Sequence, residues 1–353
     1  METSKIIRHA LNFAIKRAQT ELALNLPSVS KLFKIAFPLV LGGLILWWMY
    51  RDFDWNGLWD ALNDGMNWTW MWLSMPFGVL AQVLRAARWR QALEPLDERP
   101  RLSSCVHAVF LSYASSLVVP RVGEVLRCGV LKKYDGTSFT KSLGTVVTER
   151  MVDSLLMLLL AALTVLLQVK VFMVFFAETG VSFEELAGRF SAACLLVVLV
   201  FLAVLAKRLA WFNHTRNLLR NVVDGVLSLR NVRHVPIYIM YSLGIWASYF
   251  LHFYLTFYCF SYTSGLGITA ALIAFVVGTF AVLVPTPNGA GPWHFAVKTI
   301  LVLYGVCESD AVVFVLIVHT LQTLLVILLG LYAAGALGFT RRRCLAGGED
   351  GTE

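Results

Sequence analysis

Charged residues are scarce in this chain. They make up 15% of its 353 residues, whereas hydrophobic residues make up 58%, and the mean hydropathy is +0.68. This composition excludes an ordinary soluble domain and is typical of a protein that crosses a membrane several times. Since no polar stretch has the length of a domain, we expect no soluble catalytic domain within the chain.

The common catalytic motifs are also missing. The chain has no H-E-x-x-H zinc motif, no G-x-S-x-G nucleophile elbow, no Walker loop and no dinucleotide fingerprint. Its six cysteines form no C-x-x-C pair, which indicates free thiols and argues against a disulfide or zinc framework. The sequence therefore predicts a protein that is not an enzyme and that binds no cofactor and no metal ion. The net charge of +8 does not indicate a nucleic-acid partner, because basic residues of membrane proteins gather in loops that face anionic lipid.

The hydrophobic runs predict an all-α polytopic membrane protein with about six full spans and two re-entrant helical hairpins, eight hydrophobic segments in total. The predicted spans are residues 32–50, 68–84, 151–176, 190–206, 236–260 and 311–337, and the predicted hairpins are residues 103–133 and 269–304. Residues 32–338 would form one integral membrane domain. Residues 1–31 would form an amphipathic or loosely ordered segment, and residues 339–353 a cytoplasmic tail.

The distribution of charge predicts the orientation, because lysine and arginine favour the cytoplasmic side of a membrane. We expect the acidic loop 51–67 outside, and the N-terminus, the 85–101 loop and the C-terminal tail inside. Residues 120–150 are basic as well, so the apolar stretch before them is expected to enter from the cytoplasm and return to it. The protein would be a multi-pass protein of the cytoplasmic (inner) membrane of a prokaryote, with both termini in the cytoplasm.

The two predicted hairpins indicate an internal repeat. Each contains a helix break, at Pro120 and at Pro285, and the two hairpins would enter from opposite sides of the membrane. The halves 32–176 and 190–338 would then form an inverted repeat. Inverted repeats whose broken helices meet near the middle of the bilayer are a recurring plan of transporters.

Three charged residues follow the first break. A charge near the bilayer centre costs about 2.5–3.5 kcal/mol, so such charges usually face an internal cavity. If a helix resumes near Val122, Glu124 and Arg127 share one face of it. Arg121 and Arg127 could form a fork for a lipid phosphate, since guanidinium groups pair with phosphate through two hydrogen bonds. The alternative is a self-satisfied group of ion pairs that fixes the hairpin.

A second charged group, Glu149, Arg150 and Asp153, lies at the predicted cytoplasmic mouth of a span. Carboxylates in a first turn favour the helix dipole, so ordinary capping explains part of this pattern. Capping does not explain Asp153, which lies one turn deeper in apolar sequence. We therefore expect Asp153 to pair with Arg121 or Arg127.

The second break spans residues 285–292 and combines prolines with glycines. Gly289 and Gly291 would let the backbone approach a ligand closely, with Asn288 beside them. His294 follows the break and is a candidate for ligand binding. The alternative is that His294 forms a hydrogen bond between helices, as most lone membrane histidines do.

Together these motifs resemble the flippase-like membrane domain of the lysylphosphatidylglycerol synthase family. The motifs are Pro120 to Glu124 with Arg127, Gly144 to Val147 leading to Glu149, Arg150 and Asp153, and Pro285 to Gly291. The resemblance covers about residues 33–338. In multidomain relatives this region is thought to move a phospholipid between leaflets, while a soluble domain attaches the amino acid. Many relatives carry glutamate where this chain has His294, which departs from the family pattern.

The residues and the resemblance together predict translocation or binding of an anionic lipid, either a phospholipid or a polyprenyl-phosphate carrier. Arg121 and Arg127 would hold the phosphate, and Glu124, Glu149 and Asp153 would act as counter-charges. The alternative function is a non-transporting membrane partner of an enzyme of envelope lipids or lipid-linked glycans. Either function is compatible with a membrane-protein partner or a homo-oligomer.

Overall fold

The computed structural model describes residues 29–51, 62, 65–119, 122–167, 235–284 and 286–346, and this part is all helical. The longer helices are α2 (Val29–Tyr50), α4 (Trp68–Leu93), α5 (Leu102–Ser116), α6 (Val122–Asp135), α7 (Phe139–Leu167), α11 (Val235–Tyr254), α13 (Gly267–Ala281), α14 (Pro292–Leu303) and α15 (Glu308–Ala346). Short helical turns are η1 (Glu94–Leu96), η3 (Leu255–Cys259), α12 (Ser261–Ser264) and η4 (Pro287–Gly289). Within these ranges there is no β-strand, only one isolated bridge between Met66 and Phe260. The prediction of an all-α protein is confirmed.

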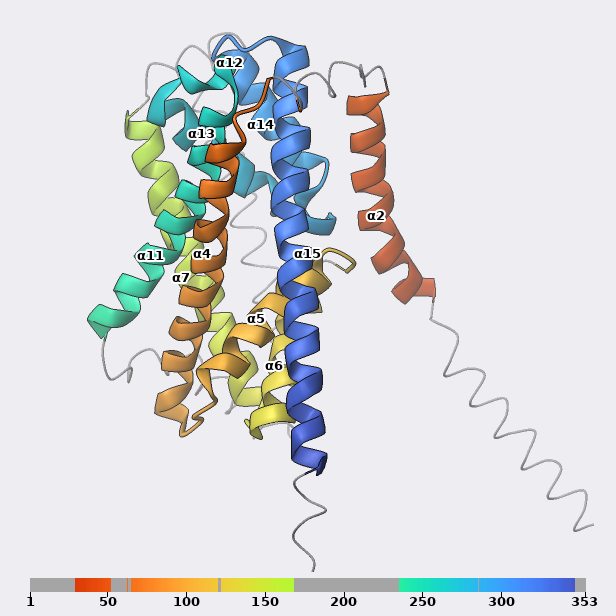
Figure 1. Cartoon of the computed structure of the whole chain (residues 1–353), viewed down its shortest axis with the longest axis vertical. Helices are drawn as coiled ribbons and strands as arrows, with labels where there is room; N and C mark the ends of the chain where they lie inside the picture. Colours follow the sequence, from red (N-terminus) through yellow and green to blue (C-terminus); the bar gives the residue numbers. More distant parts are fainter. Residues whose placement is uncertain are drawn as a thin grey trace, which may run out of the picture.

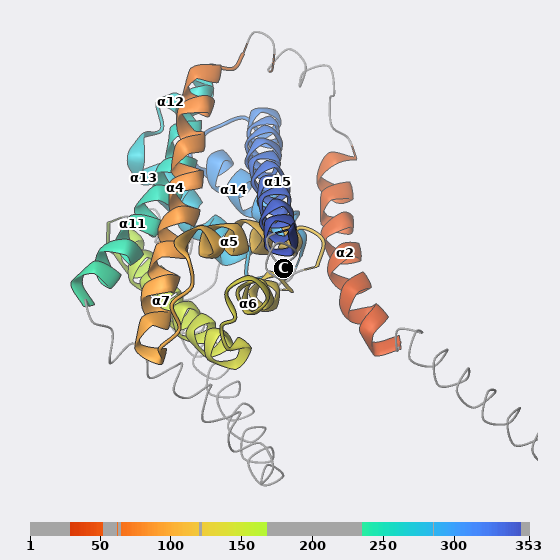
Figure 2. The same ribbon diagram turned by 60° about the horizontal axis from the view of Figure 1, so that its bottom comes forward.

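The long helices α4, α7, α11 and α15 run roughly along the long axis of the molecule (Figure 1). The pair α5 and α6 packs at one end, and α13 and α14 lie toward the other. Helix α2 stands at the side of this bundle in both views (Figures 1 and 2). Helix α4 packs against α11 and α5, and α15 packs against α5 and α14. The charged cluster described below lies where α4, α6 and α7 meet.

Helix α4 is longer than its hydropathy predicts. It begins after Asn67, whose side chain accepts a hydrogen bond from the Thr69 amide at 3.1 Å, and it continues to Leu93. The predicted span ended at residue 84, with the following arginines in a cytoplasmic loop. This part of the prediction is wrong, because Arg85 and Arg88 are buried within the helix. Their side chains are paired inside the protein, so the helix does not need to end before them.

Helices α5 and α6 form the predicted first hairpin and pack closely against each other. Pro120 and Arg121, at its tip, lie outside the described residues. The close approach depends on Gly123, because a Cβ at that position would overlap the carbonyl of Ser112 on α5. The absence of a side chain at Gly123 therefore sets the spacing of the two arms.

Helix α7 begins at Phe139, twelve residues before the predicted start at Met151. Glu149 and Asp153 consequently lie in the body of a helix and not in its first turn. Their partial explanation as N-terminal capping residues is therefore wrong, since unpaired backbone N–H groups occur only in the first turn. The described part of α7 ends at Leu167, and the predicted span 190–206 lies outside the described residues.

The second predicted hairpin consists of α13 and α14, joined by a turn that includes η4. Asn288 in this turn has a positive φ of 52°, as do Gly289 at 72° and Gly291 at 91°. Asn288 is held against α15, since its side chain donates to the Thr323 hydroxyl at 2.8 Å and its carbonyl lies 3.2 Å from Nε2 of His319. The turn is thus ordered by contacts with α15.

The end of α5 and the turn of the second hairpin both approach the middle of α15. Gly330 of α15 faces Ala114 near the end of α5, and Thr323 binds Asn288 of the second turn. Seven residues of helix separate these two positions, which is about 10 Å along the axis. Within the described residues, α15 is the helix long and apolar enough to cross a membrane by length and composition, over Glu308–Phe339. The number of spans and the inverted repeat stay predictions.

Candidate functional site

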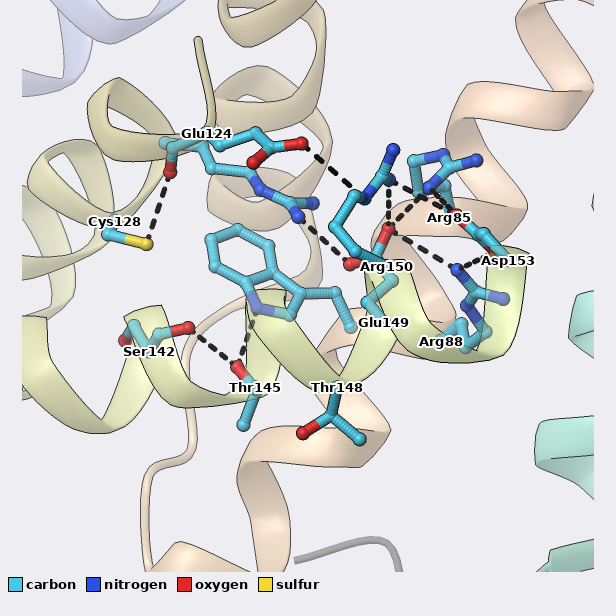
Figure 3. Close-up of polar contacts among 12 residues, drawn as sticks. Arg85, Arg88, Glu124, Cys128, Ser142, Thr145, Thr148, Glu149, Arg150 and Asp153 are labelled. Atoms are coloured by element: carbon cyan, nitrogen blue, oxygen red, sulfur yellow. Dashed lines mark hydrogen bonds and ion pairs between the residues drawn. The ribbon is translucent and has the colours of Figure 1, made fainter. Parts of the chain in front are cut away.

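Seven charged side chains from three helices form one connected cluster (Figure 3). They are Arg85 and Arg88 on α4, Glu124 and Arg127 on α6, and Glu149, Arg150 and Asp153 on α7. We call these seven residues the charged cluster. Five of them are at most 9% exposed, whereas Glu124 and Arg150 are 37% and 41% exposed.

Glu149 lies at the centre of the charged cluster. Its Oε1 atom accepts a hydrogen bond from Arg85 and lies 3.3 Å from Arg88 and 3.0 Å from Arg150. Its Oε2 atom lies 3.0 Å from Nη2 of Arg127, an ion-pair distance without the angle of a hydrogen bond. One carboxylate thus holds α4 and α6 to α7.

Asp153 lies one turn further along α7 and pairs with the arginines of α4. Its two oxygens lie 2.7 Å from Arg85 and 2.8 Å from Arg88, and Arg150 is 3.2 Å away. The prediction was that Asp153 pairs with Arg121 or Arg127, and Arg121 lies outside the described residues. The predicted pairing of Asp153 with Arg127 is wrong, because Arg127 pairs with Glu149 and the α4 arginines occupy both oxygens of Asp153.

Arg127 is enclosed by Glu149 and by an aromatic ring. Its guanidinium lies 4.6 Å from the centroid of Trp89, within the range of a cation–π interaction. The indole N–H of Trp89 in turn donates to the hydroxyl of Thr145 at 3.0 Å. The hydrogen bond to Thr145 orients the Trp89 indole, and the indole in turn orients the Arg127 guanidinium.

The α4 arginines also connect the charged cluster to α11. Arg88 donates to the hydroxyl of Ser242 at 3.0 Å, and its guanidinium lies 5.6 Å from the ring of Tyr238. Arg85 lies 5.8 Å from the ring of Tyr249. The charged cluster is therefore surrounded by aromatic rings and hydroxyl groups, which partly replace water as solvation for the arginines.

Glu124 and Arg150 form the open edge of the charged cluster. The distance from Arg150 Nε to Glu124 Oε1 is 3.5 Å, the longest ion-pair distance in the cluster. Large apolar side chains beside this edge on α6 and α7 are exposed, namely Val122, Val125, Val147 and Met151. Among the described residues, the open edge of the charged cluster is thus bordered by exposed apolar side chains on both helices.

The buried part of the charged cluster is not electrically balanced. Among the residues that the structure describes, Arg85, Arg88 and Arg127 face the two carboxylates of Glu149 and Asp153, which leaves one positive charge in excess. The Glu124–Arg150 pair is neutral and does not change this excess. Within the described part of the chain, the Nε atoms of all three buried arginines also have no hydrogen-bond partner. The cluster can thus accept one more negative charge and further acceptor oxygens.

Arg85 and Arg88 belong to this cluster although their position in the sequence predicts a cytoplasmic loop. The available signal was their spacing, since two arginines three residues apart share one face of a helix. Arg90, which breaks that spacing, is exposed. Arg121, predicted to hold a phosphate, lies outside the described residues, whereas Glu124, Arg127, Glu149, Arg150 and Asp153 come together as predicted.

The predicted residues of the second break do not join the charged cluster in any described contact. Nδ1 of His294 accepts a hydrogen bond from the Gly291 amide at 3.3 Å, so His294 caps the start of α14. The space beside Gly291, predicted to admit a ligand, is occupied by α2, since a Cβ there would lie 2.9 Å from Cβ of Ile45. A Cβ at Gly289 would similarly meet Val282 at 2.8 Å. The two glycines therefore allow close packing of the chain.

His294 does line a cavity of about 430 Å³ between α2, α14 and α15. Its walls are Leu46, Trp47, Tyr50, Arg51, Ala290, His294, Leu316, His319 and Thr320. The rings of His294 and His319 lie 4.4 Å apart between their centroids. No member of the charged cluster lines this cavity. Within the described residues, no three histidine, cysteine or acidic side chains come together as a metal site.

A comparison with protein families finds one family model that matches most of the chain. The family model described as "Lysylphosphatidylglycerol synthase TM region" matches residues 35–330. This range includes the charged cluster, both hairpins and most of α15. No match was found among curated proteins.

Proposed function

Since the chain belongs to the lysylphosphatidylglycerol synthase TM region family, we propose that it binds an anionic lipid at the charged cluster and moves it across the membrane. The lipid would be a phospholipid or a polyprenyl-phosphate carrier of the inner membrane of a prokaryote. The protein would act as a transporter without catalytic chemistry of its own.

The excess positive charge of the buried cluster carries this proposal. An uncompensated buried charge is destabilising by several kcal/mol, so a purely structural network favours equal numbers of both signs. Here three buried arginines face two buried carboxylates. A phosphodiester brings one negative charge and acceptor oxygens for the unpaired arginine Nε–H groups.

The location of the charged cluster suits a headgroup site. Arg85 lies eight residues before the end of α4, which is about 12 Å from that end of the helix. A headgroup that reaches the cluster has therefore left its usual position at the membrane surface. The end of α5 and the turn between α13 and α14, which both contact α15, would separate this site from the cavity lined by His294. Movement of these two segments would expose the lipid to either leaflet in turn.

The first prediction tests this proposal with the purified chain in phosphatidylcholine vesicles that contain a fluorescent phosphatidylglycerol. Bleaching of the outer-leaflet label by dithionite measures how fast the inner-leaflet lipid becomes accessible. We expect Arg127→Gln to slow this movement at least tenfold, because it removes the excess charge. Arg127→Lys keeps the charge but loses the planar guanidinium, and should be intermediate.

Arg101→Gln is the matched control. Arg101 is 55% exposed and pairs with Asp135 at 2.7 Å on the outside of the same helical region. The control should transport like the unaltered chain. If the unaltered chain binds phosphatidylglycerol but does not move it, the alternative function of a non-transporting membrane partner is favoured. Equal transport by Arg127→Gln and Arg101→Gln would contradict the assignment of the site.

A further inference from the structure

Arg150 contacts three carboxylates, of which Glu124 is the most weakly held. It lies 3.0 Å from Glu149 and 3.2 Å from Asp153, both of which are fixed by the buried arginines. The distance to Glu124 is 3.5 Å, and Arg150 is the ion-pair partner that the structure gives for Glu124. Breaking this contact leaves every other ion pair of the cluster in place.

On this basis we propose that Glu124 is a displaceable internal anion, which occupies Arg150 until the phosphate of a membrane lipid replaces it. The inference rests on the proposed function and names the route of entry. A lipid would approach sideways from the bilayer, between α6 and α7. Its phosphate would take the place of the Glu124 carboxylate, and the Glu124 side chain would turn outward.

The surface around Glu124 supports this route. The side chain is 37% exposed and is followed on the same helix by Val125, itself 52% exposed. On the α7 side, Val147 and Met151 are 41% and 60% exposed. The polar edge of the cluster is thus bordered by apolar side chains on both helices. Acyl chains can lie against these side chains while the headgroup enters at Arg150.

The exchange is also favourable in charge. While Glu124 is paired with Arg150, these two side chains are neutral together, and the cluster has an excess of one positive charge from its buried arginines. When Glu124 leaves, Arg150 and the buried arginines present two positive charges in excess to the same phosphate. The ligand is therefore a lipid whose phosphate is not already neutralised by a cation of its own headgroup.

A binding experiment separates this inference from the proposed function. Short-chain (dioctanoyl) phosphatidylglycerol is titrated into the detergent-solubilised chain by calorimetry, with dioctanoyl phosphatidylcholine as the zwitterionic comparison. Glu124→Gln should bind phosphatidylglycerol about two- to five-fold more tightly, the range that corresponds to one partly exposed ion pair. Glu98→Gln is the matched control, since Glu98 forms a partly exposed pair with Lys141 at 3.3 Å, and its affinity should not change.

A double-mutant cycle distinguishes competition from a general effect of charge. If Glu124 competes for Arg150, Glu124→Gln should have no effect once Arg150→Gln has removed the contested cation. Unchanged or weaker binding by Glu124→Gln alone, or an equal gain in both backgrounds, would overturn the inference. Loss of phosphatidylglycerol binding in Arg127→Gln would still support the headgroup site in that case. Failure of Arg127→Gln to weaken binding would instead count against the proposed function.

Discussion

At the scale of single residues, Glu149 is the side chain on which the charged cluster depends. It contacts four arginines from three helices, namely Arg85, Arg88, Arg127 and Arg150. A buried ion pair adds little net stability when it is complete, because desolvation offsets attraction. Removal of one partner is different, since the remaining charges stay buried without compensation. The cluster is therefore sensitive to the loss of its carboxylates.

The second prediction concerns Glu149→Gln, which leaves the buried arginines with Asp153 as their one buried carboxylate. We expect a loss of about 3–5 kcal/mol in the free energy of unfolding, the range for a broken buried pair. Thermal unfolding of the detergent-solubilised protein measures this as a lower melting temperature. Glu94→Gln, at an exposed position after α4, should melt like the unaltered chain. Equal melting temperatures for both variants would show that Glu149 is not a structural centre.

At the scale of helices, the first hairpin is shaped by the contact of α5 with α6. Gly123 faces the carbonyl of Ser112, and this close approach brings Arg127, one turn later, toward Glu149. Gly129 lies on the same helix, but none of the described residues has an atom within 4 Å of where its Cβ would be. The two glycines thus differ in what surrounds them, although both lie in α6.

The third prediction compares these two glycines. Gly123→Ala should destabilise the protein by about 1–3 kcal/mol, because the added methyl group forces α5 and α6 apart. Gly129→Ala should be neutral or stabilising by up to about 1 kcal/mol, since alanine favours a helix more than glycine does. Thermal unfolding of both variants provides the measurement. A stabilising effect of Gly123→Ala would contradict the close packing of the hairpin.

At the scale of the whole molecule, the start of α4 and the start of α15 lie at the same end of the bundle in both views (Figures 1 and 2). The distribution of charge predicts that this end faces outward. The turn between α14 and α15 lies there and contains Cys307, which is exposed, whereas Cys105, Cys128 and Cys259 are buried. A hydrogen bond with the Ser309 hydroxyl lowers the pKa of the Cys307 thiol. A lower pKa increases the thiolate fraction at neutral pH and hence the reactivity of Cys307.

The fourth prediction follows from the exposure and the predicted orientation of Cys307. A membrane-impermeant maleimide should label the protein in intact cells whose outer envelope has been opened. Cys307→Ser should remove that part of the labelling, which separates Cys307 from all other cysteines. Labelling of Cys307 that begins only after the inner membrane is permeabilised would reverse the orientation.

Local patterns were enough to predict the helical class, the helices that form the arms of the two hairpins, and the burial of the α7 carboxylates, whereas the re-entrant placement of the hairpins stays a prediction. Apolar runs indicate helices, and proline or glycine residues indicate where those helices break. A charged residue inside an apolar run indicates that its side chain has a partner of opposite charge. For this reason the arms of both hairpins and the gathering of Glu124, Arg127, Glu149, Arg150 and Asp153 agree with the structure.

The identity of the partners could not be predicted in the same way. Arg85 and Glu149 are separated by 64 residues, and Arg88 and Ser242 by 154, so no local pattern links them. The hydropathy pattern predicted that the span ends at residue 84, before Arg85 and Arg88. Hydropathy assigns a cost to each charged residue and takes no account of carboxylates elsewhere in the chain that compensate the charge. Packing of α4 against α7 supplies those carboxylates and keeps both arginines inside the helix. Whether a buried arginine has a compensating carboxylate depends on which helices pack together, and the tertiary structure alone decides this packing.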